Sequence, residues 1–393
     1  MKKKGLFIFF DGLWSTIIDS QVLLHVQEMN KSGYDFEVLV LPGTKNEYNM
    51  SLKKLGTIKD KYDIPITVKR GIRQTIPGGE LINVIILYRE IRKQGIIFDI
   101  IHARTDYAAC VCSLLKIFIK FELIWDCRGD AEAEFSQMFI AHTLLRRVIK
   151  FMYLQRLKWT RFCASLFSDK AIFVSSELKD TKGKYFNKFS QVIPCTASDK
   201  LFRFSSDARE QTRIQLGYTK DDIVLVYSGS IVYYQCFDEC MVLFKELHEA
   251  NKRVKLLILT PHVEKALTVL RYFPENCYQI YSATLEQVNS YLNAADFGFL
   301  LRKEDKVNSV ASPVKFAEYS LAGLPVLTTK AVKQVVDLGE QLNNVIYCDS
   351  ANLPDCLTIY TNEERIAISQ KAIELLSRKI STIKYIGLYT NTI

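Results

Sequence analysis

The sequence predicts an α/β protein of two domains, each built on a parallel sheet covered by helices. Short apolar runs of strand length alternate with segments of helical period along the chain. The length of 393 residues suits two domains of ordinary size. A proline and small polar residues interrupt the alternation at 193–199, which predicts the link between the domains there.

Strand and helix signals follow one another in both halves of the chain. In the first half we expect strands at 6–10, 37–41, 65–68, 99–102, 122–126 and 171–174. In the second half we expect them at 223–227, 255–259, 278–281, 297–300, 325–327 and 345–347. Helices are expected in most gaps, for example at 19–31, 81–94, 237–250, 285–294 and 363–376. These elements predict a Rossmann-like domain at 1–195, a second at 196–375 and a terminal segment at 376–393.

The composition is that of a soluble globular protein, with 48% hydrophobic and 24% charged residues. No apolar run approaches the roughly 20 residues that span a bilayer. The apolar stretch that follows the first lysines is too short for a signal peptide and is interrupted by Asp11, so we expect a buried first strand. These features favour a cytoplasmic protein.

Ten cysteines form no CxxC pair, and the five histidines show no metal-ligand spacing. We interpret the cysteines as small buried hydrophobes in a reducing compartment, and we expect neither a metal nor a cofactor. No strand is followed by a GxGxxG motif, which disfavours a dinucleotide oxidoreductase.

The net charge of +9 is concentrated in one stretch. Between 135 and 168 there is no acidic residue, while apolar and aromatic residues at 139–162 are interleaved with basic ones. This pattern is typical of peripheral binding to an anionic membrane, here the inner face of the cell membrane. A core helix with a solvated basic face is the alternative. Nucleic acid is not expected, because no recognised binding module surrounds the stretch. The basic residues are Arg146, Arg147, Lys150, Arg156, Lys158 and Arg161.

The segment 312–329, SPVKFAEYSLAGLPVLTT, carries the strongest functional signal. Pro313 suits the first turn of a helix, whose outward N–H groups and positive dipole end would seat a phosphate. Lys315 could add a charge to that seat, and Glu318 could accept two hydroxyl hydrogen bonds from a ribose. The segment therefore predicts a nucleotide-sugar site. An ordinary amphipathic helix with both side chains solvated is the alternative.

This segment resembles the donor-binding helix of glycosyltransferases of the GT-B fold, especially family four, which carries a Glu-x-x-x-Ala-Gly-x-Pro-Val pattern. Glu318, Ala322, Gly323, Pro325 and Val326 occupy those places. Further similarity lies at 169–177, 192–202, 226–230 and 292–298. The stretches 99–104 and 124–129 resemble bacterial enzymes that build surface polysaccharides.

The resemblance implies two Rossmann-like domains facing each other across a cleft. The first domain would bind the acceptor and the second the donor, with the terminal segment crossing back to the first. The implied activity is transfer of a hexose-like sugar from a nucleotide diphosphate-sugar to a glycan or lipid-linked glycan, with retention and without a metal. A nucleotide-sugar epimerase of the same fold and a non-catalytic glycosyltransferase-like partner remain alternatives.

The candidate site residues fall on both domains. Donor-binding residues are expected to be Gly229, Ser230, Arg302, Ala311, Ser312, Pro313, Lys315 and Glu318, the last two also as catalytic residues. Acceptor-side residues are expected to be Gly12, Trp14, Ser15 and Arg128.

His102 and Asp126 are the expected catalytic residues of the first domain. Each is predicted to end a strand, so each side chain should lie at the carboxyl edge of the sheet and point toward the substrate. His102 would hydrogen-bond the donor sugar or the acceptor, and Asp126 would orient the acceptor hydroxyl. A hydrogen-bonded strand-end histidine and a helix N-cap are the respective alternatives.

Two positions depart from the family pattern. Val310 stands where the family usually has its first glutamate, and 230–235 lacks the usual Arg and Lys that neutralise the donor diphosphate. Lys315, Arg302 and Lys303 are the candidate replacements for those charges.

Overall fold

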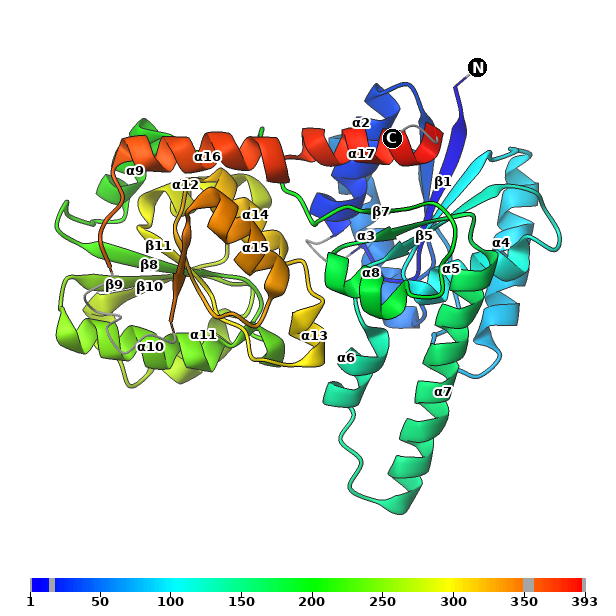
Figure 1. The fold of residues 1–393 in the computed structure, drawn as a ribbon, viewed down its shortest axis with the longest axis horizontal. Helices are drawn as coiled ribbons and strands as arrows, with labels where there is room; N and C mark the ends of the chain where they lie inside the picture. The colour runs from blue at the N-terminus through cyan, green and yellow to red at the C-terminus, as the bar shows by residue number, and fades with distance from the viewer. Residues whose placement is uncertain (1, 14–17, 349–356, 391–393) are drawn as a thin grey trace. The chain divides into compact units, whose positions relative to one another are not determined.

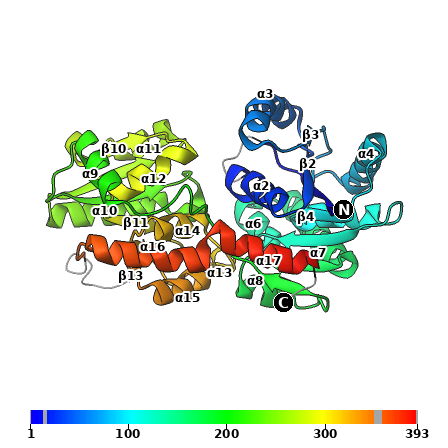
Figure 2. The ribbon, with the colours of Figure 1, turned by 90° about the horizontal axis from the view of Figure 1, so that it is seen from above.

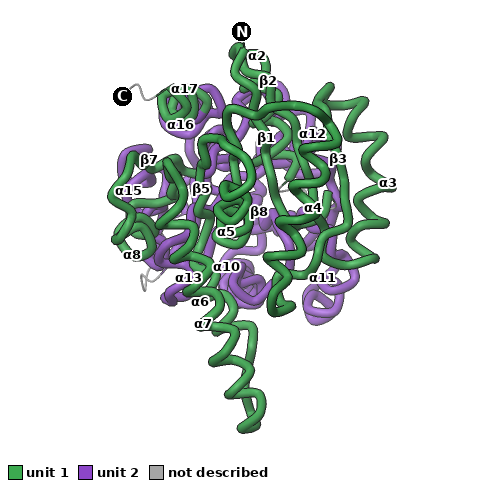
Figure 3. Tube along the Cα trace, turned by 90° about the vertical axis from the view of Figure 1, so that its right-hand side faces the viewer, with its two compact units in different colours: residues 1–194, 382–393 green, residues 195–381 purple. Residues whose placement is uncertain are grey.

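The structure is a computed structural model that describes residues 2–13, 18–348 and 357–390. It divides into two units (Figure 3): unit 1 comprises residues 1–194 and 382–393, and unit 2 comprises residues 195–381. Trp14 and Ser15, expected on the acceptor side, lie outside the described residues.

Within the described residues, unit 1 contains a seven-stranded parallel sheet in the order β3-β2-β1-β4-β5-β6-β7 (Figure 1). Its strands are β1 Lys4–Phe9, β2 Asp35–Val40, β3 Ile66–Val68, β4 Ile100–Arg104, β5 Glu122–Cys127, β6 Lys170–Phe173 and β7 Ser190–Val192. Its helices are the π-helical turn η1 Asp19–Leu23, then α2 Leu24–Lys31, α3 Lys45–Tyr62, α4 Gly79–Gln94, α5 Asp106–Leu115, α6 Ala131–Met138, α7 Leu144–Phe167 and α8 Ser176–Lys182.

Unit 2 contains a six-stranded parallel sheet in the order β10-β9-β8-β11-β12-β13. Its strands are β8 Ile223–Ser228, β9 Val254–Leu259, β10 Tyr278–Tyr281, β11 Phe297–Leu300, β12 Val326–Thr328 and β13 Val345–Tyr347. Its helices are α9 Ser206–Gln215, η2 Tyr233–Gln235, α10 Phe237–Ala250, α11 Val263–Leu270, η3 Glu275–Cys277, α12 Leu285–Ala294, α13 Lys306–Ser309, α14 Val314–Leu321, α15 Lys333–Leu342 and α16 Asn362–Leu376. The last helix, α17 Arg378–Thr390, begins at the end of unit 2 and continues into unit 1.

Local sequence explains where several helices begin. Thr44 and Thr361 form capping boxes with glutamates three residues later, at the starts of α3 and α16. Asp130 accepts a hydrogen bond from Ala133 N–H and caps α6. Asp126, whose alternative role was an N-cap, is therefore not the capping residue of the helix that follows it.

Both sheets are buried between helices (Figure 1, Figure 2). In unit 2, alternate residues of the strands belong to two different apolar clusters, one around Phe316 and one around Phe244. Since alternate side chains of a strand point to opposite faces, each face of the sheet has its own cluster. In unit 1, the apolar cluster around Phe7 includes Tyr385 and Tyr389 of α17. The carboxyl-terminal helix is thus part of the core of unit 1.

The predicted alternation of strands and helices is confirmed, and every predicted strand has a counterpart. Strand β7 was not predicted, because it is short and begins with Ser190 and Gln191. Strand β4 ends at Arg104 rather than at His102, and β5 ends at Cys127 rather than at Asp126. This shift at the strand ends changes where the side chains of His102 and Asp126 point.

Candidate functional site

The candidate donor site lies at the carboxyl edge of the unit 2 sheet. The strand order reverses between β8 and β11, and in open parallel sheets ligands bind beyond the carboxyl ends of the strands at such a point. The loop after β8 carries Gly229 and Ser230, and the loop after β11 carries Arg302. Helix α14 connects β11 to the parallel strand β12, so its amino end lies at this same edge.

The loop after β8 favours a glycine at its first position. Gly229 has a φ of 153°, and a Cβ added there would lie 2.5 Å from Gln235 Oε1. Its N–H donates to Leu259 O at 2.9 Å, and the Tyr227 hydroxyl donates to Ser230 O at 2.8 Å. The backbone at Gly229 therefore packs closely against Gln235 and has a conformation that residues with a Cβ rarely adopt.

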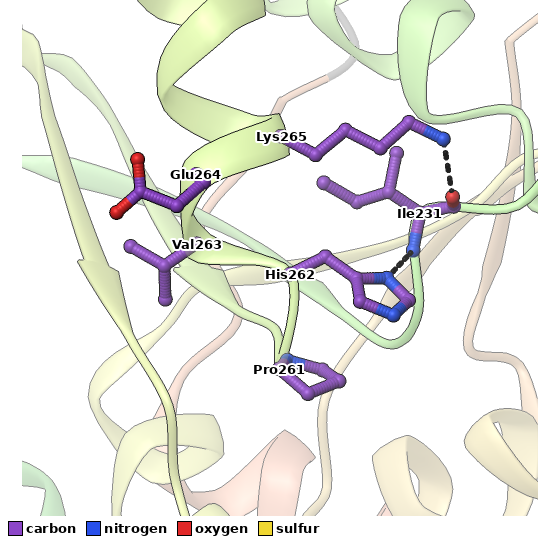
Figure 4. Close-up of a pocket in the computed structure, with 6 residues that line it drawn as sticks. All are labelled: Ile231, Pro261, His262, Val263, Glu264 and Lys265. Atoms are coloured by element: carbon purple, nitrogen blue, oxygen red, sulfur yellow. Dashed lines mark hydrogen bonds between the residues drawn. The ribbon is translucent and has the colours of Figure 1, made fainter.

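The same loop is held from the side of α11 (Figure 4). Ile231 N–H donates to His262 Nδ1 at 3.0 Å, and Lys265 Nζ donates to Ile231 O at 2.8 Å. These residues line a cavity of about 440 Å³ together with Pro261, Val263 and Glu264. His262 and Lys265, which the sequence analysis did not single out, thus fix the loop that follows β8.

Arg302 belongs to the loop after β11, and its guanidinium reaches the end of the loop after β8. Its Nη1 donates to Leu301 O at 2.7 Å and to Gln235 O at 3.4 Å. The Thr329 hydroxyl holds the backbone of Arg302 in place, because it accepts a hydrogen bond from Arg302 N–H and donates one to Arg302 O. The guanidinium is half-buried and placed beside the segment 230–235, which contains no cation of its own. Lys303 instead pairs with Glu239, at 2.5 Å.

Helix α14 presents an amino end without a capping side chain. Pro313 is its N-cap residue and provides no capping hydrogen bond. Ser312 Oγ accepts from Cys195 N–H at 2.8 Å, which fixes the Ala311–Pro313 turn within unit 2. Phe316 N–H donates to Pro313 O at 3.1 Å, and no side chain caps the N–H groups of Val314 and Lys315, so these two are available to an anion.

Lys315 and Glu318 lie one turn apart on α14 and form an ion pair, with Lys315 Nζ 2.7 Å from Glu318 Oε2. Glu318 is 3% exposed, whereas the Lys315 side chain is 28% exposed. The alternative of two solvated side chains is therefore wrong for Glu318. The pair holds a carboxylate and an ammonium group together near the uncapped end of the helix.

Tyr319 and Arg365 position α14 and were missed by the sequence analysis. The Tyr319 hydroxyl accepts from Ser228 N–H at 3.1 Å and donates to Phe299 O at 3.4 Å, which ties the helix to β8 and β11. The buried Arg365 guanidinium donates to carbonyl oxygens at the carboxyl ends of α12 and α14. A Cβ on Gly323 would lie 2.3 Å from Arg365 O, so the turn after α14 needs a glycine. The carbonyls belong to Leu292, Asn293, Ala295, Ala322 and Gly323.

The expectation that His102 ends a strand is wrong. His102 is in the middle of β4, opposite Phe7 of β1, so its side chain leaves a face of the sheet rather than the carboxyl edge. It is fully buried, its ring stacks on that of Phe7 at 4.3 Å, and its Nδ1 is 2.7 Å from the Tyr389 hydroxyl of α17.

Asp126 is likewise fully buried, and Arg128, Arg104 and His102 of unit 1 surround it. Arg128 Nε is 2.8 Å from Asp126 Oδ1, and His102 Nε2 is 3.2 Å from Asp126 Oδ2. Arg128 Nη2 also donates to the Tyr385 hydroxyl at 3.1 Å. We name His102, Asp126, Arg128, Tyr385 and Tyr389 the buried cluster. It connects β4 and β5 to α17.

Burial and charge set the protonation of the buried cluster. Burial lowers the pKa of His102, so the imidazole is neutral. Burial alone would raise the pKa of Asp126, but Arg128, His102 and Arg104 together hold it below its usual range. Burial raises the pKa of the Tyr389 hydroxyl, which therefore keeps its proton. The buried cluster therefore holds an ionised carboxylate beside a guanidinium and a neutral imidazole.

Gly12, expected on the acceptor side, is buried in the segment that follows β1. Arg128, also expected there, is a member of the buried cluster. Val310, in the place of the family's first glutamate, is buried at the end of α13. Among the described residues, no three His, Cys, Asp or Glu side chains are grouped so that they could hold a metal ion.

No protein-family model matches the sequence, and no curated protein matches it. Solved structures do match along the whole chain. HepE from Anabaena in complex with UDP has a TM-score of 0.72 at 15% identity, covering 100% of both chains. A glycosyltransferase from Rickettsia africae has a TM-score of 0.70 at 14% identity, covering 99% of this chain and 98% of that one.

A putative UDP-N-acetylglucosamine 2-epimerase from Listeria monocytogenes also matches, with a TM-score of 0.61 at 13% identity, covering 100% of this chain and 96% of that one. At these identities the likeness shows the fold alone. The chain has the α/β fold of two Rossmann-like domains, as in GT-B glycosyltransferases.

Proposed function

We propose that the protein is a glycosyltransferase that moves a sugar, most simply a hexose, from a nucleotide diphosphate-sugar to a glycan or a lipid-linked glycan. The observation that supports this most is the carboxyl edge of the unit 2 sheet. There a strained glycine loop, a half-buried arginine and an uncapped helix end with a Lys-Glu pair come together. A solved structure of the same fold, HepE, holds UDP-glucose.

Each part of this edge has a task in the proposed donor complex. The diphosphate binds at the amino end of α14, where the N–H groups and the helix dipole favour an anion. Lys315 and Arg302 provide the cations that the segment 230–235 lacks. Glu318, already held by Lys315, accepts hydrogen bonds from the ribose hydroxyls.

The proposed reaction retains configuration and needs no metal. The bond from the anomeric carbon to the diphosphate oxygen breaks, and the acceptor oxygen forms its new bond on the same face of the sugar. The acceptor proton passes to the leaving diphosphate. Lys315, Arg302 and the helix N–H groups stabilise the charge that develops on the leaving group. His102 and Asp126 are assigned no chemical step, because both are fully buried within unit 1.

The test is a thermal-shift screen of nucleotide sugars, followed by calorimetry on parent, Glu318→Gln and Glu340→Gln proteins. A cognate donor at about 100 times its dissociation constant should add about 2.7 kcal/mol of stability to the parent. Glu318→Gln should weaken its binding at least about tenfold, because a charge-assisted hydrogen bond contributes about 1.5–3 kcal/mol. Glu340, exposed on α15, is the matched control. Equal affinity of all three proteins would contradict the site.

A nucleotide-sugar epimerase is the second candidate, because an epimerase is among the solved structures of this fold. An epimerase would convert its nucleotide sugar without any acceptor, whereas the proposed transferase needs one for turnover. Incubation with the donor identified in the screen, followed by chromatography of the sugar, separates the two. A non-catalytic partner, which the buried Val310 would suit, would give no product in either assay.

A further inference from the structure

Helices α6 and α7 form a hairpin that extends from the rest of unit 1 (Figure 1, Figure 3). The buried residues of α7, Thr160, Cys163 and Ala164, lie in its carboxyl-terminal half, where Ser113 of α5 donates to Cys163 O at 3.4 Å. In the amino-terminal half, the ring of Tyr153 contacts that of Phe135 in α6. The amino-terminal half of α7 and the turn before it contain no buried residue. The tip of the hairpin is therefore exposed to solvent on several sides.

An apolar stripe, interrupted by the exposed Gln155, follows one side of α7. Apart from the adjacent Phe151 and Met152, its members follow one another at intervals of three, four and seven residues, which places them on one side of a helix. Their exposed fractions lie between 46 and 79%, although side chains of this kind are usually buried. Met138 and Ile140 extend the apolar surface across the turn, at 84 and 63%. The stripe consists of Leu144, Val148, Phe151, Met152, Trp159, Phe162 and Leu166.

Positive charge borders this stripe. Three of the six basic side chains of α7 have partners: Arg156 pairs with Glu80, Arg161 pairs with Glu132, and Lys150 donates to Ser136 O. Arg146, Arg147 and Lys158 are exposed. Arg147 and Lys158 are four residues before and seven after Phe151, so all three lie on the same side of the helix.

We propose that this hairpin, residues 138–166, binds the surface of an anionic lipid bilayer. Aromatic and aliphatic side chains with flanking Arg and Lys are the combination that partitions into the headgroup region. Within the described residues no helix has the length and hydropathy needed to cross a bilayer, so the stripe lies in the interface. A second copy of the chain is a poor occupant of the stripe. A two-fold symmetric contact would bring Arg147 and Lys158 of one copy toward Arg147 and Lys158 of the other, and these like charges repel. This inference does not depend on the proposed sugar transfer.

The experiment uses the full chain and vesicles of phosphatidylcholine with or without phosphatidylglycerol. We expect sedimentation with the anionic vesicles, weak binding to the neutral ones and loss of binding as salt is raised. Trp159 lies in the stripe, so its emission should shift to the blue when anionic vesicles are added. Trp159→Phe should remove most of the shift while the protein still sediments.

Variants distinguish the hairpin from general surface charge. Arg147→Gln with Lys158→Gln should lower partition onto anionic vesicles about thirtyfold, since each cation contributes about 1 kcal/mol. Phe151→Ser with Phe162→Ser should lower it at least about tenfold. The matched control is Ile214→Ser with Lys220→Gln, two exposed positions in unit 2, which should bind like the parent.

Three results would overturn the inference. One is a parent protein that binds neither vesicle, or both equally. Another is hairpin variants that bind like the control while their circular dichroism matches that of the parent. The last is a parent protein that does not bind vesicles but forms a dimer in analytical ultracentrifugation, where Phe151→Ser with Phe162→Ser abolishes the dimer. That result would assign the stripe to a contact with a second copy of the chain.

Discussion

Each unit contains a cluster of polar and charged side chains near its central strands, and the two clusters differ in their access to solvent. In unit 1, His102 and Asp126 are fully buried and bind α17 through Tyr389 and Arg128. In unit 2, the Lys315–Glu318 pair is buried only at its carboxylate, beside the uncapped end of α14. We interpret the first arrangement as structural and the second as part of the proposed donor site.

The difference has a simple geometric origin. A side chain within a strand leaves a face of the sheet, where helices cover it, while a residue beyond the carboxyl end reaches the edge where ligands bind. His102 is two residues before the end of β4. Arg302 is two residues after the end of β11. Substitutions in the buried cluster should therefore lower stability, and substitutions at the unit 2 edge should lower donor affinity.

The largest effect is expected from Asp126→Asn. The variant leaves the Arg128 and Arg104 side chains, 11 and 10% exposed, facing a neutral amide, so unit 1 should lose about 3–5 kcal/mol of unfolding free energy. All three tryptophans of the chain belong to unit 1, so urea unfolding followed by tryptophan fluorescence reports on that unit. Asp180→Asn, exposed on α8, is the control. A loss no larger than that of the control would contradict the role given to the buried cluster.

Arg302→Gln should produce the opposite pattern at the unit 2 edge. Loss of the guanidinium should weaken nucleoside diphosphate binding at least about tenfold, because charge-assisted hydrogen bonds contribute about 1.5–3 kcal/mol. The unfolding midpoint should change little, since the side chain is half-buried and donates to two backbone carbonyls, those of Leu301 and Gln235. Lys245→Gln, exposed on α10, controls for the lost charge. Unchanged affinity in calorimetry would remove Arg302 from the site.

Acidification should destabilise unit 1 through His102. The folded-state pKa of His102 is lowered, mainly by burial, so between about pH 6.5 and that lower value the unfolded chain binds a proton that the folded chain does not. The stability is therefore fully present above pH 6.5 and is lost as the pH falls. Urea unfolding from pH 7.5 downward should be less steeply pH-dependent for His102→Gln than for the parent. Identical slopes would mean that His102 is not held neutral.

The smallest effect is expected from Gly229→Ala. The added Cβ meets only the end of the flexible Gln235 side chain, but the backbone conformation remains unfavourable, so we expect a loss of about 1 kcal/mol and severalfold weaker donor binding. Gly217→Ala also lies at a positive φ, with no atom near its Cβ, and serves as the control for backbone strain. Equal donor affinity in the two variants would mean that the loop after β8 does not contact the ligand.

Much of the fold was predictable because its signals are local. Apolar runs of strand length and the Ser, Thr and Asp residues that cap helices are visible in any stretch of the sequence. The 312–329 segment was predictable for the same reason: its proline, helix, glycine turn and strand are contiguous. The structure places them in that order, from Pro313 to Thr328.

The parts that could not be predicted depend on residues far apart in the chain. Tyr389 binds His102 from a position 287 residues away, and Arg365 caps the carboxyl ends of α12 and α14 from a helix that follows both. The strand-end prediction for His102 failed for a local reason, since Ala103 and Arg104 continue β4 without a turn signal. A buried arginine or tyrosine has no sequence signature, because its partners are defined only when the chain folds.

Hydrogen exchange of the full chain, with and without saturating nucleoside diphosphate, tests the central claim most directly. UDP, ADP, GDP, CDP and dTDP would be compared, and exchange would be followed by mass spectrometry of peptides. We predict slower exchange at 229–235 and 311–318 with at least one of them, and little change around His102 and Asp126. Protection confined to unit 1, or none with any of the five, would contradict a donor site at the carboxyl edge of unit 2.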